Sequence, residues 1–280
     1  MRLSNGYRCE LPKPAVMGII NVSPNSFFNP HLNVDDALRT VDRMVVDGAD
    51  ILDIGGEATN PFVDINAEAP SIQHEIDRVV PLVEAVKKRF DVLVSVDTSR
   101  PQVMREVVKA GTDIINDQRA LAVGDVMLTV AALQTPVCLM HFTKPKQTSK
   151  PRDPAMLLDI IKRDFINLIQ RCEDHGIARD RIILDPGFGQ GNYGKSCAEN
   201  YYLLANLHEF TAMGFPVLVG WSRKSMVSDA VGGVPPQDRL FGSIAAETLA
   251  AFKGSSIIRT HDVKAVADMV KVTNCIMEYC

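Results

Sequence analysis

The sequence predicts a single (β/α)8 barrel that spans residues 1–280. Eight short apolar runs follow one another along the chain, and stretches with a helical period separate them. The length suits this fold, which typically takes about 250 residues. The alternative is an open doubly wound sheet, which typically carries G-x-G-x-x-G after its first strand. The absence of that motif and the eight even units favour the closed barrel.

Each apolar run is rich in branched aliphatic residues and ends at a turn signal, which indicates a strand buried on both faces. Right-handed crossovers between such strands imply a parallel sheet. The predicted strands are residues 15–21, 50–56, 92–99, 113–118, 136–142, 181–187, 216–222 and 256–261.

Helical periodicity with recognisable start and stop residues predicts six helices between the strands. Asn33 and Ser71 are candidate N-caps, Pro101 opens the third helix, and Gly48 and Gly176 end the first and fourth. The predicted helices cover residues 34–48, 71–90, 100–111, 155–176, 240–254 and 263–279. Residues 143–154, which are polar, basic and proline-rich, are expected to form a long exposed loop that could act as a lid.

Composition excludes several classes of function. The net charge is −4, so a nucleic-acid partner, which normally needs a basic face, is not expected. The first residues lack the apolar core of a signal peptide, and no apolar run approaches the roughly 18 residues of a membrane span. Six scattered cysteines indicate reduced thiols, and six histidines without ligand spacing argue against a pre-built transition-metal site. We therefore expect a cytoplasmic protein without a membrane partner.

Polar residues stand at the C-terminal ends of the predicted strands, where a barrel of this type places its active site. Carboxylates, amides and cations would gather there around one mouth. In chain order these residues are Asn21, Asp53, Asp97, Asn116, His141, Asp185, Ser222, Arg223, Lys224, Arg259 and His261.

Asp97 and Asp185 are the candidates for binding a ring with a guanidine-like edge, since a carboxylate can accept two parallel N–H donors. Asn116 could offer a donor and an acceptor to the same ring. The alternative for Asp97 is that it caps the following helix. For Asp53, a structural role is as plausible as ligand binding, because a buried charge must be paired. Gly55 and Gly56 either form a turn or let a ligand approach the backbone.

Two cationic groups predict an anionic ligand. Ser222–Lys224 follows the seventh strand, and Arg259 with His261 closes the eighth, where barrels of this type often bind phosphate. The alternative is a solvated basic loop. Phe27 and Phe28 could belong to a mobile cover, and Met140 and Phe188 could form flat apolar walls or belong to the core.

Long motifs now identify a family. The segments 17–27 (MGIINVSPNSF), 50–61 (DILDIGGEATNP), 94–99 (VSVDTS), 114–121 (IINDQRAL), 136–141 (PVCLMH), 183–189 (ILDPGFG), 218–225 (LVGWSRKS) and 257–263 (IIRTHDV) resemble dihydropteroate synthase. They occur in order from Met17 to Val263. The resemblance implies a TIM barrel, usually a homodimer and a target of sulfonamides, which joins a hydroxymethyl-dihydropterin diphosphate to p-aminobenzoate with Mg²⁺ and releases pyrophosphate.

The resemblance also implies roles for individual residues. Asp97, Lys224, Arg259 and His261 would be catalytic. The pterin pocket would consist of Asp97, Asn116, Met140, Asp185 and Lys224. Asn21, Arg259 and His261 would bind the diphosphate, with Asn21 also a ligand of magnesium, and Phe27, Thr59, Pro61 and Ser222 would face p-aminobenzoate.

The chain departs from the family pattern at three places. Asn25 replaces the usual acid of the first loop, and Asn60 replaces an arginine that helps to hold the diphosphate. The sixth loop is longer than usual, and Gln190 lies where the family has an aromatic residue nearby. Loss of one charged contact would cost about 1.5–3 kcal/mol of diphosphate binding, so Asn60→Arg is predicted to tighten it.

Two rival functions stay open at this point. One is a pterin-binding homologue that transfers weakly or not at all, which the departures at Asn25 and Asn60 would favour. The other is an aldolase-like barrel in which Lys224 forms a Schiff base and the charge of Arg223 lowers its pKa.

Overall fold

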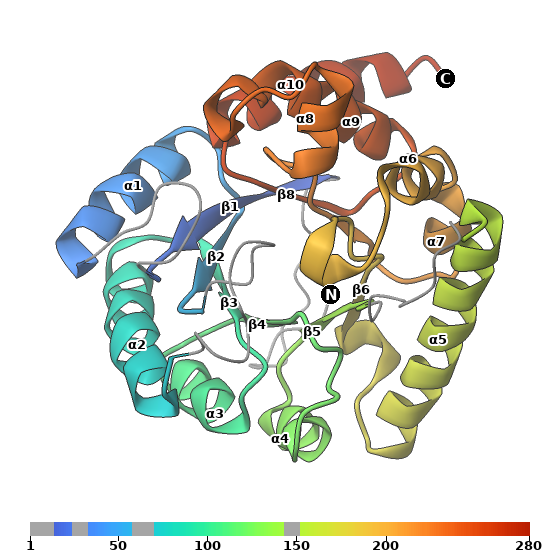
Figure 1. Cartoon of the computed structure of the whole chain (residues 1–280). Helices are drawn as coiled ribbons and strands as arrows, with labels where there is room; N and C mark the ends of the chain where they lie inside the picture. Colours follow the sequence, from blue (N-terminus) through green and yellow to red (C-terminus); the bar gives the residue numbers. More distant parts are fainter. Residues whose placement is uncertain (1–13, 24–32, 58–69, 143–151) are drawn as a thin grey trace.

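Eight parallel strands form a nearly closed barrel, which confirms the predicted fold (Figure 1). The computed structural model describes residues 14–23, 33–57, 70–142 and 152–280. The strand order is β6-β5-β4-β3-β2-β1-β8-β7, and a bridge between Leu184 and Val217 joins β6 to the chain just before β7. The strands are β1 Ala15–Asn21, β2 Ile51–Gly55, β3 Leu93–Asp97, β4 Ile114–Asp117, β5 Val137–Met140, β6 Ile182–Asp185, β7 Leu218–Val219 and β8 Ile257–Thr260.

The helices form an outer ring around the strands (Figure 1). The predicted helices are present as α1 Val34–Val46, α2 Ile72–Arg89, α3 Pro101–Lys109, α5 Pro154–Asp174, α9 Leu240–Phe252 and α10 Val263–Met277. Both predicted N-caps hold: Asn33 accepts a hydrogen bond from the Asp36 N–H, and Ser71 accepts one from the His74 N–H. Each cap satisfies an N–H that has no partner inside its helix.

Four α-helices were not predicted: α4 Val126–Leu133, α6 Cys197–Ala205, α7 His208–Thr211 and α8 Ser225–Ala230. The sequence of α4 is apolar on nearly all sides, so it has no amphipathic period to detect. Helices α7 and α8 are too short to show one. The start of helix α6 could have been predicted from the sequence, because Ser196 and Glu199 form a capping box. Short 3-10 helices occupy Arg179–Arg181, Gly191–Tyr193 and Pro236–Asp238.

The barrel interior is an apolar plug beneath a polar layer. Buried side chains from alternate strand positions form the plug: Ala15, Met17, Ile51, Ile114, Cys138, Ile183, Leu218 and Ile257. Successive residues of a strand point to opposite faces, so the residue two positions further on faces the interior again, nearer the mouth. This step leads from Ile51 to Asp53, from Ile114 to Asn116 and from Ile183 to Asp185. A period of two thus carries polar groups into the barrel mouth.

The remaining strand residues face outwards and pack against the helices in the main core. None of the helices in the described ranges combines the length and the apolar character needed to span a membrane. Within the same ranges, Cys138, Cys172, Cys197, Cys275 and Cys280 are free thiols, as predicted.

Candidate active site

Asp53 forms the floor of the barrel mouth. Its carboxylate is fully buried and accepts hydrogen bonds from Ser95 Oγ at 2.6 Å, Asn116 Nδ2 at 3.0 Å and Arg259 Nε at 2.6 Å. Neighbouring strands β2, β3 and β4 supply three of these residues, and β8 supplies the arginine. Of the two roles considered for Asp53, the structure therefore favours the structural one. Its carboxylate orients Asn116 and Arg259, two predicted ligand-binding side chains.

Asp97 lies at the C-terminal end of β3 and is 8% exposed. Its Oδ2 accepts hydrogen bonds from Gln118 Nε2 and, at 3.5 Å, from an Arg259 terminal nitrogen. Burial and then the nearby Asp53 carboxylate raise the pKa of Asp97, while Arg259 and Gln118 act against the shift. Asp97 therefore needs cationic or N–H partners to be held ionised.

Asp185 and Lys224 lie on the opposite side of the mouth. The Asp185 carboxylate accepts a 2.7 Å hydrogen bond from the Gly187 N–H, and burial raises its pKa. Burial also lowers the pKa of Lys224 to about 8, although Asp185 favours its charged form. The Lys224 ammonium donates to the Phe188 carbonyl and lies 4.8 Å from the centre of the Tyr193 ring. Gly220 provides room, because a Cβ there would lie 3.8 Å from Lys224 Nζ.

A buried lysine behind this pair was not predicted. Lys195 is 4% exposed, and its ammonium donates to the carbonyls of Gly187 at 2.7 Å and His141 at 3.3 Å. Burial lowers the pKa of Lys195 to about 7, while the charge of Asp185 acts in the opposite direction. Lys195 thus fixes the backbone turn that follows Asp185.

Met140 and Phe188 differ in where they lie. Met140 ends β5 beside Asp185 on β6 and is 4% exposed, so it adjoins the predicted pterin pocket. Phe188 is buried and its ring packs against Trp221, with ring centres 5.4 Å apart. Phe188 is therefore a core residue, as one of its two interpretations proposed.

Arg259, His261 and Ser222 meet at the β7 and β8 side of the mouth. Ser222 Oγ accepts hydrogen bonds from the His261 N–H at 3.0 Å and from Thr260 Oγ1 at 3.3 Å, and it lies 3.0 Å from His261 Nδ1. The Ser222 hydroxyl can then donate to Nδ1, which places the imidazole proton on Nε2. Burial and then Arg259 lower the pKa of His261 to about 3. His261 is therefore neutral here and acts as a hydrogen-bonding group rather than as a cation.

Two other predicted mouth residues serve the scaffold. Arg223 forms a two-pronged ion pair with Asp262, at 2.8 and 2.6 Å, and also binds the carbonyls of Pro236 and Gln237. The expected basic patch is therefore smaller, because Arg223 already has a carboxylate partner. His141 Nε2 lies 3.1 Å from Asp164 on α5, which directs its ring towards the helices.

Asn21 ends β1 in register with Gly55 at the end of β2. A Cβ on Gly55 would lie 3.8 Å from Asp97 Cβ and 3.9 Å from Asn21 Oδ1, so Gly55 opens space between these side chains. A Cβ on Gly56 would lie 2.8 Å from Val79 Cγ1 on α2. Gly55 therefore serves the site, whereas Gly56 serves helix packing.

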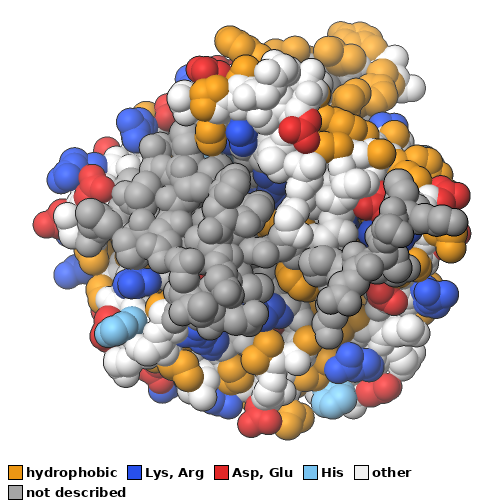
Figure 2. Space-filling view, in the orientation of Figure 1, with side chains coloured by type: hydrophobic (Ala, Val, Ile, Leu, Met, Phe, Trp, Pro, Cys, Tyr) orange, Lys and Arg blue, Asp and Glu red, His pale blue; other side chains and the backbone are white. Residues whose placement is uncertain are grey.

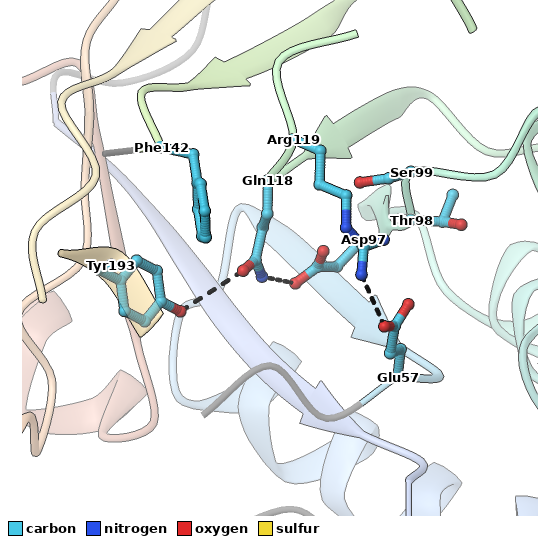
Figure 3. A pocket seen from close by; sticks show the side chains of 8 residues that line it. All are labelled: Glu57, Asp97, Thr98, Ser99, Gln118, Arg119, Phe142 and Tyr193. Atoms are coloured by element: carbon cyan, nitrogen blue, oxygen red, sulfur yellow. Dashed lines mark hydrogen bonds and ion pairs between the residues drawn. The ribbon is translucent and has the colours of Figure 1, made fainter. Parts of the chain in front are cut away.

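A small pocket adjoins Asp97 (Figure 3). Its lining residues are Glu57, Asp97, Thr98, Ser99, Gln118, Arg119, Phe142 and Tyr193. Arg119 binds Glu57 at 2.8 Å along one wall. Tyr193, three positions after Gln190 on the same loop, contributes an aromatic ring to this pocket. Gln190 instead donates to Cys197 Sγ and Asp229. Gly191 and Gly194, both with positive φ, were the signal for this turn.

Some predicted residues lie outside the described ranges. They are Asn25, Phe27, Phe28, Thr59, Asn60 and Pro61. The lid expectation for residues 143–154 also falls largely on residues outside these ranges. Their roles stay predictions.

Comparison with known proteins decides the family. The family model described as "Pterin binding enzyme" matches residues 17–261. The dihydropteroate synthase of Escherichia coli strain K12 is 43% identical over 272 residues, which cover 96% of this chain and 94% of that protein. The chain belongs to the dihydropteroate synthase family. The resemblance seen in the sequence is thereby confirmed.

Solved structures of dihydropteroate synthases agree with this assignment. The enzyme from Coxiella burnetii, in complex with pteroic acid, is 56% identical, with a TM-score of 0.93 and coverage of 100% of this chain and 98% of that one. The enzyme from Xanthomonas albilineans, in complex with 7,8-dihydropteroate, is 35% identical, with a TM-score of 0.84 and 99% coverage of both chains. Both ligands contain a pterin ring, which is the kind of group the polar layer was predicted to bind.

The magnesium ion that the sequence resemblance implies stays a prediction. Within the described residues, no group of three or more histidine, cysteine or acidic side chains could hold a metal ion. Mg²⁺ typically binds through one or two protein oxygens together with substrate phosphates. The side-chain oxygen of Asn21 at the barrel mouth fits that donor set.

Proposed function

We propose that this chain joins 6-hydroxymethyl-7,8-dihydropterin diphosphate to p-aminobenzoate, giving 7,8-dihydropteroate and pyrophosphate. The observation that carries the proposal is the pairing of two buried acids with an amide and a lysine around one barrel mouth. Asp97, Asn116, Asp185 and Lys224 offer the acceptors and donors that a pterin edge requires.

The pterin ring would bind with its N–H edge on the carboxylates. N–H donors on the ring favour the ionised form of Asp185, whose pKa burial raises. Asn116 is held by Asp53 and cannot rotate freely, so its amide is oriented before the ligand binds. The exocyclic carbon of the ring would then face the β8 side of the mouth, where Arg259 lies.

The diphosphate would leave on the side of Arg259 and His261. Arg259 keeps its charge because Asp53 and Asp97 favour it, and its guanidinium can stabilise the charge that develops on the leaving oxygen. Neutral His261 would donate a hydrogen bond from Nε2. Loss of pyrophosphate leaves a carbocation that the electron-rich ring stabilises and the Asp97 carboxylate helps to offset.

Magnesium belongs to this proposal through Asn21, which would hold it together with the diphosphate. When bound, the ion would supply charge neutralisation on the leaving group. The arylamine nitrogen would then attack the exocyclic carbon, form the new C–N bond and lose a proton. No covalent bond to the enzyme is required. The Schiff-base alternative relied on the charge of Arg223 beside Lys224, but Arg223 is paired with Asp262, and burial is the main cause of the lowered Lys224 pKa.

The decisive assay measures pyrophosphate release and dihydropteroate formation with Mg²⁺, in the presence and absence of p-aminobenzoate. We expect both products in equal amounts when both substrates are present. Pterin binding without product would instead favour the inactive-homologue alternative. Asp97→Asn keeps the shape of the side chain but loses its charge. We expect it to lower kcat/KM roughly 10- to 150-fold, which corresponds to a loss of about 1.5–3 kcal/mol in transition-state stabilisation.

We also propose a homodimer through the outer face of α8, α9 and α10. Figure 2 shows hydrophobic groups gathered at this end of the molecule. The large exposed apolar side chains on these helices and directly after them are Val231, Phe241, Leu249, Phe252, Val272, Ile276 and Tyr279. Apolar exposure on this scale typically marks a protein interface. Sedimentation should give a dimer for the wild type, and Phe241→Asp should give a monomer. A wild-type monomer at micromolar concentration would refute the dimer.

Two properties follow from the same proposal. Sulfonamides, which resemble p-aminobenzoate, would compete with it and not with the pterin diphosphate. A cytoplasmic location stays a prediction, which fractionation of cells would test.

A further inference from the structure

We propose that Gln118 is a positioning residue that orients the Asp97 carboxylate for the pterin ring and links it to Tyr193 on the loop after β6. This inference rests on the proposed function. Gln118 lies within the segment 114–121 that resembles the family, but the sequence analysis assigned it no role. Gln118 follows β4 directly and lies between the other two side chains in the pocket (Figure 3).

The Gln118 amide donates one hydrogen bond and accepts another. Its Nε2 donates to Asp97 Oδ2, and its Oε1 accepts a hydrogen bond from the Tyr193 hydroxyl at 3.4 Å. The Tyr193 ring in turn lies 4.8 Å from the Lys224 ammonium. The chain Tyr193–Gln118–Asp97 therefore joins loops from β6 and β4 to the end of β3, across the pocket.

Within the described part of the chain, no other side chain makes a hydrogen bond of this kind to Asp97. The Arg259 contact with Asp97 Oδ2 is 3.5 Å long, whereas the same guanidinium is only 2.6 Å from Asp53. Among the described residues, both contacts reach Oδ2, so Oδ1 is left for an N–H of the ring. A neutral amide suits this task, because it orients the carboxylate without cancelling the charge that the ring needs.

The ionisation of Asp97 depends on several surrounding groups. Those that act on it or are influenced by it are Asp53 on β2, Glu57 after β2, Arg119 after β4, Cys138 on β5 and Arg259 on β8. Gln118 lowers the pKa of Asp97, in opposition to burial and Asp53. Loss of the amide should therefore move ionisation of Asp97, and pterin binding with it, to higher pH.

The test compares three variants in the full-length protein. Gln118→Met keeps the length but removes both hydrogen bonds, and Gln118→Glu keeps the shape but faces Asp97 with a like charge. Tyr193→Phe keeps the ring beside Lys224 and removes only the hydroxyl. The matched control is Gln170→Met, because Gln170 makes a 2.9 Å bond to Asp174 on the exposed side of α5, away from the site.

Calorimetry would measure the Kd of 6-hydroxymethylpterin and, separately, of inorganic pyrophosphate. We expect Gln118→Met to raise the pterin Kd about three- to tenfold at pH 7, in line with loss of one ordinary hydrogen bond, because the Gln118 amide acts on the ring only through Asp97. Gln118→Glu should raise it further, Tyr193→Phe less, and Gln170→Met should not change it. Pyrophosphate should bind equally to all four. The pH of half-maximal pterin binding should rise in Gln118→Met.

An unchanged pterin Kd and pH profile in Gln118→Met would overturn the inference, as would equal weakening of both ligands. Thermal melting identifies a variant that fails to fold, in which case Gln118→Glu carries the test. Neither ligand requires turnover. Failure of the wild type to form dihydropteroate would therefore refute the proposed function, whereas normal turnover with unaltered pterin binding in the variants would refute only the role of Gln118.

Discussion

The Asp53 carboxylate accepts a 2.6 Å hydrogen bond from Arg259 Nε, although the two residues are 206 positions apart in the chain. The contact joins β2 to β8, the two strands on either side of β1. Asp53 is fully buried and Arg259 is one-fifth exposed, so the carboxylate depends on the guanidinium for its charge balance. The same guanidinium is the group proposed to stabilise the leaving diphosphate, so barrel stability and leaving-group binding share one ion pair.

Removal of Asp53 should therefore affect both properties. Asp53→Ala leaves Arg259, Asn116 and Ser95 without their common acceptor, and we expect a loss of about 3–5 kcal/mol in the free energy of unfolding. Asp53→Asn should cost less, because it retains one acceptor oxygen. Urea denaturation would measure both. Lys109→Ala, which breaks an exposed pair with Glu106, should leave the unfolding free energy unchanged.

Addition of a methyl group should affect stability at Gly56 and substrate affinity at Gly55. In Gly56→Ala the new Cβ would lie 2.8 Å from Val79 Cγ1, so we expect destabilisation of about 1–3 kcal/mol. In Gly55→Ala the methyl group has room between Asp97 and Asn21, so stability should change little while substrate affinity falls. Thermal melting and pterin calorimetry on the two variants separate these effects. Equal melting temperatures would contradict the packing argument.

Lys224 should control pterin binding through its charge. Loss of a charged hydrogen-bond partner typically costs about 1.5–3 kcal/mol, so Lys224→Met should weaken pterin binding roughly 10- to 150-fold. Lys224→Arg should restore little, because a planar guanidinium cannot replace a compact ammonium in this space. Borohydride trapping with carbonyl substrates should yield no adduct in the wild type, and a stable adduct would revive the aldolase alternative.

The Lys224 charge should also set the upper pH limit of pterin binding. Burial lowers the pKa of Lys224 to about 8, so its charge is present below that pH and is lost above it. In the wild type, pterin affinity should fall as pH rises past about 8, and this dependence should disappear in Lys224→Met. Calorimetry from pH 6 to 10 would measure it, with the buffer ionisation heat corrected.

Two buried histidines should make the folded state less stable at acidic pH. Burial lowers the pKa of His141 to about 4 and that of His261 to about 3, both below the ordinary value of 6.5. The unfolded chain therefore binds more protons than the folded one between these values, and stability falls as pH decreases. The loss should begin near pH 6.5 and continue towards pH 4. In His141→Gln, urea titrations should show a shallower decline over this window; an unchanged decline would contradict the contribution of His141.

The sequence by itself determined the barrel and most of its mouth. Eight apolar runs and their period of two were enough to place Asp53, Asp97, Asn116 and Asp185 at strand ends, because local hydrophobic pattern sets which face of a strand is buried. Family motifs then supplied the chemistry. The short or uniformly apolar helices escaped detection, since they carry no amphipathic period.

Only the tertiary structure decided which of these polar groups pair with one another. Arg223 pairs with Asp262 and His141 with Asp164, whereas Arg259 pairs with Asp53 past the intervening strand β1. Gln118 enters the site directly after β4, and Tyr193 enters from the loop after β6, whose path depends on glycines with positive φ. Such pairings bring together residues that are distant in sequence, and they are settled by the need to satisfy buried charges in three dimensions rather than by any local pattern.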